Sequence, residues 1–210
     1  KNIIKVFLFL FSAIFAVTPF AQSQPSSKNL RIIVPFAVGG ASDTYTRLVS
    51  QKMTELTGRT VIVENKTGVP GMVAGSTAAP DGYTMTMGTS GVLAVNPAVF
   101  EKLPYDVTKD FVYVGGLAIT PMIVVVSAAL PYNTVQELIA AAKKEPGKFN
   151  VGYGGVNNTQ HLTGELFKFT TGVNMVGVNY KGSAAAVTDL LGGQISILVD
   201  SMAVALPHIK

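Results

Sequence analysis

Short apolar runs alternate with segments of helical period along most of this chain. Such alternation is typical of an α/β fold with a largely parallel sheet. The pattern predicts strands at 30–36, 60–64, 83–87, 111–119, 122–127, 149–153, 175–180 and 195–199. It predicts helices at 42–57, 72–79, 134–144, 159–171 and 183–191. An apolar face on the first helix carries Tyr45, Leu48, Val49, Met53 and Leu56, which is the spacing of an amphipathic helix.

Local signals mark several helix ends. Gly58 is expected to end the first helix as a left-handed C-cap, and Gly172 is expected to stop the helix 159–171. Thr134 and Glu137 have the spacing of a capping box, which predicts a helix start at this point.

The first 23 residues have the pattern of an export signal. Lys1 and Lys5 give a positive start, residues 6–17 are apolar, and small residues follow at Ala21-Gln22-Ser23. The alternative is a membrane anchor, but the apolar run is short for a bilayer span. We therefore expect residues 1–23 to be a signal peptide and the rest to be exported.

Composition excludes several kinds of site. The whole chain has a formal net charge of +4, and removing residues 1–23 takes away two lysines and no acid, which leaves +2. Its Lys and Arg residues are not clustered, so no nucleic-acid partner is expected. The chain has no cysteine, which rules out thiol catalysis and thiolate metal sites. Its two histidines, His161 and His208, are far apart in sequence, so no metal site is expected.

Three loops between predicted strands and helices combine glycine with Ser, Thr or Asn. They span 37–43, 88–91 and 154–160. Ligands bind at such strand–helix junctions in α/β sheets, and free N–H groups at helix N-termini favour carboxylate or phosphate. For each loop taken alone, a structural turn is the commoner role.

Polar side chains near these loops have two interpretations each. Asp43 either stabilises a helix start or takes part in a site. Asp200 follows an apolar run and is expected at the carboxyl end of a strand, facing the crevice. His161 either donates to an anion or makes a structural hydrogen bond. Tyr180 and Lys181 lie between a strand and a helix, where a solvated lysine is the default.

Several motifs resemble those of one receptor family. They are "PFAVGGASD", "APDGY", "LPYD", "QHL", "YKG" and "DLLGGQ", and together they resemble the extracytoplasmic receptors of tripartite tricarboxylate transporters, also called Bug receptors. The resemblance implies a two-lobed periplasmic-binding-protein fold of type II, located in the periplasm. It also implies a monomer without cofactor that closes on a small organic carboxylate and delivers it to membrane permease subunits.

The resemblance also implies a domain organisation and a site. Residues 24–103 would form the first part of lobe 1, and 104–210 would form lobe 2. The implied ligand-binding residues are Phe36, Ala37, Gly39, Gly40, Ala41, Ser42, Asp43, Thr89, Ser90, Gly154, Val156, Asn157, Asn158, Thr159, His161, Tyr180, Lys181 and Asp200.

The chain departs from the family pattern at two points. Asn157-Asn158 stands where relatives often have Gly-Ser; because Asn tolerates left-handed backbone and caps helices, the loop is expected to persist. The chain stops at Lys210, whereas family members continue for roughly a domain-sized piece, so we expect a fragment that does not fold and bind normally. The alternative function is an exported α/β enzyme acting on a small acidic substrate through His161 or Asp200.

Overall fold

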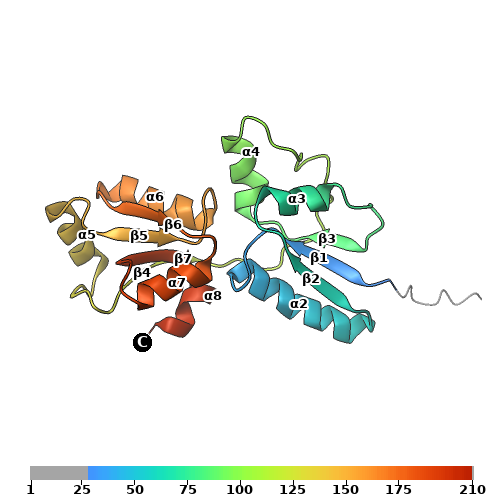
Figure 1. Ribbon diagram of the computed structural model, residues 1–210, viewed down its shortest axis with the longest axis horizontal. Helices are drawn as coiled ribbons and strands as arrows, with labels where there is room; N and C mark the ends of the chain where they lie inside the picture. The colour runs from blue at the N-terminus through green and yellow to red at the C-terminus, as the bar shows by residue number, and fades with distance from the viewer. Residues whose placement is uncertain (1–27, 210) are drawn as a thin grey trace, which may run out of the picture.

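A computed structural model of the protein describes residues 28–209, so the expected signal peptide at 1–23 lies outside the described residues. The described chain forms two α/β lobes that lie side by side, each built on its own sheet (Figure 1). Among these residues, no helix has both the length and the apolar character needed to cross a bilayer.

The first lobe contains a three-stranded parallel sheet in the order β2-β1-β3. Its elements are β1 (Leu30–Val34), α2 (Ala41–Thr57), β2 (Val61–Asn65), α3 (Val69–Ser76), β3 (Thr84–Thr86), the π-helical turn η1 (Gly91–Val95) and α4 (Asn96–Val99). Helix α2 covers one face of this sheet, and α3 and α4 lie on the other side (Figure 1). Each strand therefore ends beside the start of a helix.

The second lobe contains a four-stranded sheet in the order β4-β7-β5-β6. Its elements are β4 (Met122–Val126), α5 (Val135–Lys144), β5 (Asn150–Tyr153), α6 (Thr159–Thr171), β6 (Val176–Asn179), α7 (Ser183–Leu191), β7 (Ile197–Ser201), α8 (Met202–Ala205) and the 3-10 turn η2 (Leu206–His208). Strand β4 runs antiparallel to β7, and the other pairs are parallel. The expected α/β class is confirmed in both lobes.

The core of the second lobe is organised around Tyr153. Its ring is fully buried with Phe149, Val151 and Ile197 between the sheet and helices α5 and α6. Its hydroxyl donates to Glu165 at 3.0 Å. Burial, together with that bond to a carboxylate, raises the pKa of Tyr153.

The core of the first lobe extends past residue 103. Tyr105 is buried with Met72 and Val92, and Phe111 packs against the same cluster. The Tyr105 hydroxyl donates to the Val92 carbonyl at 2.7 Å, and burial raises its pKa despite a hydrogen bond from Asn96. Residues 104–111 therefore pack against α3 and η1 of the first lobe, although they fall on the lobe 2 side of the boundary implied at residue 103.

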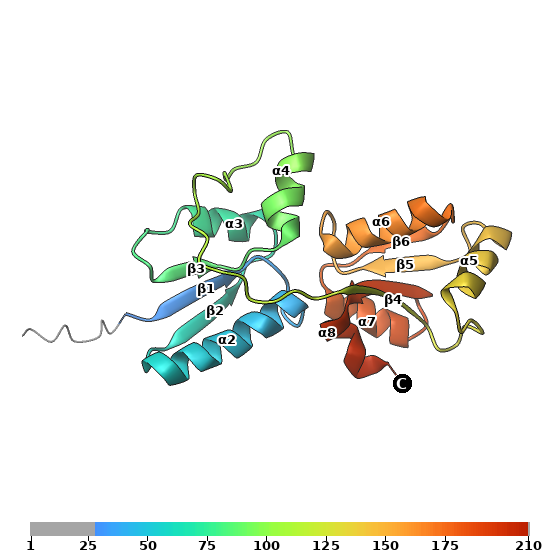
Figure 2. The ribbon, with the colours of Figure 1, turned by 180° about the vertical axis from the view of Figure 1, so that it is seen from behind.

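The segment after Phe111 contradicts one predicted strand. Residues 112–119 form no strand and run as an exposed connection from the first lobe to the second (Figure 2). Val112, Val114 and Ile119 are among the most exposed apolar side chains of the described chain. An apolar alternation becomes a strand only where a ladder partner is available, and none pairs with this segment in residues 28–209.

The buried face of α2 also differs from its apolar face. Leu48 and Leu56 are exposed, whereas Asp43, Thr46 and Ser50 are buried. Thr46 donates from its hydroxyl to the Ser42 carbonyl at 2.7 Å, so its polar group is satisfied within the helix. Small polar side chains thus form much of the buried face. Tyr45, Val49 and Met53 of the predicted apolar face are half-buried, so the buried face is displaced from the predicted one and only partly overlaps it.

The predicted helix ends are confirmed. Gly58 and Gly172 are left-handed C-caps of α2 and α6, and Thr134 with Glu137 forms a complete capping box at the start of α5.

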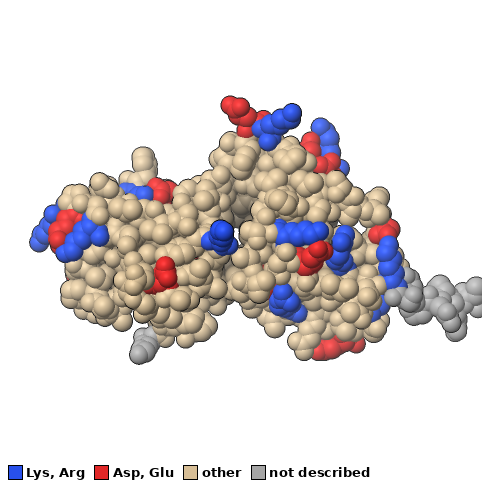
Figure 3. Space-filling model, in the orientation of Figure 1, with Lys and Arg blue, Asp and Glu red and all other residues tan. Residues whose placement is uncertain are grey.

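Acidic and basic side chains are interspersed on the face shown in Figure 3, and most of that face is uncharged.

Candidate functional site

The loops of the two lobes meet at two places. At the first, Ala37 of the β1–α2 loop lies against Gly182, the N-cap of α7, and Gly39 lies near Ala184. At the second, Gly91 at the start of η1 lies against Asn158, the N-cap of α6. Helix N-termini of both lobes are therefore brought to one boundary.

The β1–α2 loop is held by a buried carboxylate. Asp43, only 3% exposed, accepts the N–H of Gly39 at 3.0 Å, Nε of Arg47 at 3.0 Å and Nδ2 of Asn65 at 2.9 Å. Asn65 also donates to the Phe36 carbonyl at 3.1 Å. Gly39 has φ +82, a conformation that favours glycine. The network fixes the loop at both of its ends.

Asp43 is charged in this setting. Burial acts to raise the pKa of Asp43, but the hydrogen bonds from Arg47, Gly39 and Asn65, and the charge of Arg47, outweigh it and leave the pKa below its ordinary value. The N-cap of α2 is Gly40, with no side-chain cap. Asp43 therefore holds the loop through Gly39 and does not cap the helix, although it lies in the first turn of α2.

The first N–H groups of α2 have no hydrogen-bond acceptor within the helix. Ala41, Ser42 and Asp43 are the first three helical residues, and the opening N–H groups of an α-helix have no carbonyl acceptor within it. Because Arg47 and Asn65 already satisfy the nearby carboxylate, these donors are available to an anion at the lobe boundary.

The second loop is shorter. Thr89 accepts from the Leu93 N–H through its carbonyl at 2.9 Å, and Ser90 is the exposed N-cap of η1. Gly91, which follows, faces the loop 157–158 of the other lobe. Thr89 and Ser90 therefore lie beside the boundary.

The third loop is shaped by its two asparagines. Asn157 has φ 54 and is the sole non-glycine residue with positive φ in the described chain. Asn158 caps α6, its Oδ1 accepting the His161 N–H at 3.0 Å. Asn157 thus adopts left-handed backbone and Asn158 caps a helix, the two properties for which the sequence analysis expected the loop to persist. Gly154 packs against Ser183, Val156 is exposed and Thr159 begins α6.

Two buried polar atoms near this loop have no partner in the described protein. The His161 ring packs edge-on against Tyr153 with centroids 5.2 Å apart, and its Nδ1 is unpartnered. Asp200 is fully buried; its Oδ1 accepts the Ser201 N–H at 2.7 Å and Gln160 Nε2 at 3.4 Å, and its Oδ2 has no partner.

Asp200 lies at the carboxyl end of its strand, as expected, one residue before the end of β7 and opposite Ile123 of β4. The strand extends two residues past the predicted 195–199 because its ladder with β4 reaches Ser201.

Tyr180 and Lys181 have different surroundings. The Tyr180 hydroxyl donates to Asp189 at 2.7 Å. Burial and this carboxylate raise the pKa of Tyr180 to about 12, so its polar group is engaged within its own lobe. Lys181 is exposed beside Gly182. Three residues at the boundary were not among the predicted site residues: Gly91, Gln160 and Gly182. They lie, respectively, in the loop 88–91, in the loop 154–160 and in the "YKG" motif.

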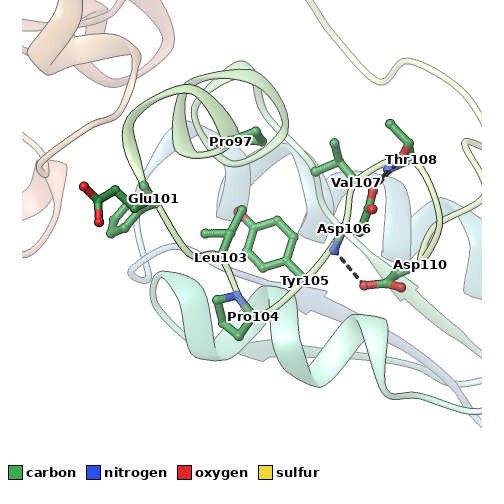
Figure 4. Close-up of a pocket in the computed structure, with 10 residues that line it drawn as sticks. Pro97, Glu101, Leu103, Pro104, Tyr105, Asp106, Val107, Thr108 and Asp110 are labelled. Atoms are coloured by element: carbon green, nitrogen blue, oxygen red, sulfur yellow. Dashed lines mark hydrogen bonds between the residues drawn. The ribbon is translucent and has the colours of Figure 1, made fainter.

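A separate hollow of about 600 Å³ lies on the first lobe. Figure 4 shows it between α4 and the loop that follows, with the ring of Tyr105 at its centre. Its walls carry Glu101, Asp106 and Asp110. Hydrogen bonds from Thr108 and Lys109 hold the pKa of Asp106 well below its ordinary value. Three acids disfavour an anionic ligand at this place.

No group of three potential metal-ligating side chains occurs within residues 28–209. The arrangement at the lobe boundary instead offers backbone N–H groups and side-chain amides, which are donors suited to a carboxylate.

Comparison with known proteins identifies relatives over nearly the whole chain. The model of the tripartite tricarboxylate transporter family receptor matches residues 45–210. BugT of Bordetella pertussis is 32% identical over 207 residues, which cover 97% of this chain and 63% of BugT. The chain thus spans less than two thirds of the length of this relative.

Solved structures of two proteins are also similar to this chain. A periplasmic transporter superposes with a TM-score of 0.85 at 42% sequence identity, and the match covers 89% of this chain and 63% of the transporter chain. An R. palustris protein solved with adipate superposes with a TM-score of 0.84 at 32% identity, covering 88% of this chain and 62% of its own.

Proposed function

The chain belongs to the receptor family of tripartite tricarboxylate transporters, and from that premise we propose that it binds a small organic carboxylate between its lobes. The proposed receptor acts in the periplasm as a monomer and delivers its ligand, chemically unchanged, to membrane permease subunits. A linear dicarboxylate is the proposed ligand class, because a relative with the same two-lobed fold was solved with adipate.

One observation supports this proposal most directly: helix N-termini from both lobes meet at one boundary. Each N-terminus carries a partial positive charge and free N–H groups. In the proposed complex, the β1–α2 loop and the loop 154–161 share one carboxylate of the ligand. Asp43, neutralised by Arg47, holds the first loop without repelling the anion.

The remaining predicted residues have supporting roles in the proposal. Thr89 and Ser90 lie on the lobe 1 side of the boundary, where they would contact the distal part of the ligand. Asp200, with its unpartnered oxygen, and Lys181 are proposed to influence which carboxylates are accepted.

A proline substitution at the start of α2 tests the role of the N–H donors. Ala41 is the first helical residue and follows Gly40, whose φ −80 and ψ 169 suit a residue before proline. Ala41→Pro removes one N–H that has no helical partner, so the helix is retained. A hydrogen bond to a charged ligand is worth about 1.5–3 kcal/mol, so adipate affinity should fall by about 10- to 100-fold.

Val135→Pro is the matched control. Val135 is the first residue of α5 and follows Thr134 with φ −132 and ψ 153, so proline is equally tolerated there, remote from the lobe boundary. Isothermal titration with adipate should give the wild-type affinity for this control. Equal affinities for both proline variants would contradict the role of the α2 donors.

A screen distinguishes receptor from enzyme. Melting temperatures are measured with adipate, malate and citrate, and each acid is recovered and examined by NMR. A ligand at 100 times its Kd should stabilise the folded chain by about 2.7 kcal/mol and be recovered unchanged. Conversion of the acid to a product would favour the enzyme hypothesis, and the absence of any shift at millimolar concentration would count against carboxylate binding.

A further inference from the structure

Two glycines at the lobe boundary are not required by backbone conformation. Gly182 has φ 171 and ψ 163, which is extended backbone that any residue adopts. Gly91 begins the η1 turn and does not have positive φ. Glycine at these positions is therefore explained by the atoms that a Cβ would meet, not by backbone conformation.

The space around Gly182 is closed by the opposite lobe. A Cβ at Gly182 would lie 2.7 Å from the Cβ of Ala37, and nothing else beyond its chain neighbours lies within 4 Å. Real side chains do not approach so closely, so an added methyl group must separate these two surfaces. Ala37 is itself small and lies in the loop that Asp43 holds through Gly39.

Gly91 repeats this arrangement at the second contact. A Cβ there would lie 3.3 Å from the Cα of Asn158 and 3.5 Å from the Asn157 carbonyl oxygen. Both atoms are backbone, so neither can turn aside as a flexible side chain would. The clash expected here is milder than at Gly182, because 3.3 Å lies closer to ordinary contact distance.

Glycines elsewhere in the second lobe contrast with this pair. A Cβ at Gly164 would meet the Tyr153 ring of its own lobe, and one at Gly192 would meet the Thr188 carbonyl of its own helix. Substitution there perturbs packing within a lobe. A Cβ at Gly182 would meet the opposite lobe alone, and one at Gly91 would make its shortest contact with the opposite lobe and an ordinary contact with Thr89 of its own.

We propose that Gly182 and Gly91 are positioning residues that set the closed state of the two lobes, Gly182 against Ala37 and Gly91 against Asn158. The proposal rests on the proposed function in one respect: closure is what brings the donors of both lobes onto the ligand. The residue size at 182 then sets the equilibrium between open and closed forms, and with it the apparent ligand affinity.

The test measures the distance between the lobes directly. Because the chain has no cysteine, Leu56→Cys on α2 and Lys144→Cys on α5 provide two exposed and unique labelling sites. The distance distribution between spin labels is recorded without ligand and with adipate. Gly182→Ala should shift the unliganded distribution to longer distances, Gly91→Ala should shift it less, and Gly192→Ala should leave it unchanged.

A second substitution tests whether the contact between Ala37 and Gly182 causes the shift. Ala37→Gly combined with Gly182→Ala moves the methyl group from one side of the contact to the other and should restore the wild-type distribution. Gly182→Ala alone should lower adipate affinity by about tenfold, because overpacking a close contact opposes closure. The double variant should recover most of that loss.

Two results overturn the proposal. One is an unliganded distribution that is the same for wild type and Gly182→Ala. The other is a shift that Ala37→Gly does not reverse, which would place the effect within α7. If adipate fails to bind even the wild type, the proposed ligand is wrong, but the unliganded distances still decide the role of the glycines.

Discussion

Replacing Asp43 by asparagine should cost stability in a way that depends on pH. The carboxylate accepts hydrogen bonds from Gly39, Arg47 and Asn65. Asparagine has one acceptor oxygen, and its amide group would point N–H bonds at these donors. Hydrogen bonds to a charged group contribute about 1.5–3 kcal/mol each, and breaking a buried pair costs about 3–5 kcal/mol.

Solvent reduces this cost. The Arg47 side chain is half exposed, so its attraction to Asp43 is screened and the lower end of the range applies. We therefore expect Asp43→Asn to lower the free energy of unfolding by about 3 kcal/mol at pH 7. Such a loss is a large part of the stability of a typical domain.

The sign of the pH dependence follows from the lowered pKa. The ordinary value is 3.8, and the folded-state pKa of Asp43 lies below it. The contribution of the carboxylate to stability is therefore complete above about pH 3.8 and is lost as the pH falls through the folded-state pKa. The difference between wild type and Asp43→Asn should be largest at neutral pH and shrink in acid.

Urea denaturation followed by circular dichroism at pH 7 and pH 3 measures both quantities. Glu55→Gln, an exposed acid on the same helix, is the control and should change stability by less than about 0.5 kcal/mol. A loss below about 0.5 kcal/mol for Asp43→Asn at pH 7, or one of equal size at both pH values, would refute the reasoning.

Three further substitutions test other parts of the structure by the same denaturation assay. Thr134→Ala removes the acceptor of the Glu137 N–H and should cost about 1 kcal/mol; no loss would mean that the cap is replaced by solvent. Gly164→Ala places a Cβ against the Tyr153 ring, far inside ordinary contact distance, and should cost about 3 kcal/mol or prevent folding; a wild-type stability would show that α6 can move. Asp200→Asn replaces a fully buried carboxylate that has an unpartnered oxygen and should raise stability by about 1 kcal/mol at pH 7; a marked loss would reveal a hidden partner for the charge.

Elements with strong local signals were predictable from sequence. Helices α6 and α7 span the predicted residues 159–171 and 183–191 without a shift. Asn158 and Gly172 cap α6 at its two ends, and such caps act within a few residues of the chain. Local chemistry therefore decides where these helices begin and end.

Features that depend on distant partners were not predictable in this way. Residues 112–119 have strand-like alternation but no ladder partner among the described residues. Leu48 and Leu56 have the spacing of a core face, yet Thr46 and Ser50 are buried instead. Which face of α2 meets the sheet depends on packing with β1 and β2, which the sequence of α2 alone does not contain.

The candidate site was predictable at the level of loops. Glycine and asparagine identified the strand–helix junctions, and the structure brings those junctions to the lobe boundary. The close approach of Gly182 to Ala37 was not predictable, because residues 145 positions apart in sequence meet there only after both lobes fold.

Three tyrosines with raised pKa values give this chain an optical property. It has no tryptophan, so its near-ultraviolet absorbance is that of tyrosine and phenylalanine. The pKa is raised for Tyr105 in the first lobe and for Tyr153 and Tyr180 in the second. Their neutral forms stabilise the fold below about pH 10, and this stabilisation is lost as the pH rises through the raised values. Tyrosinate absorbance that grows late in an alkaline titration would therefore report the loosening of each lobe without any added label.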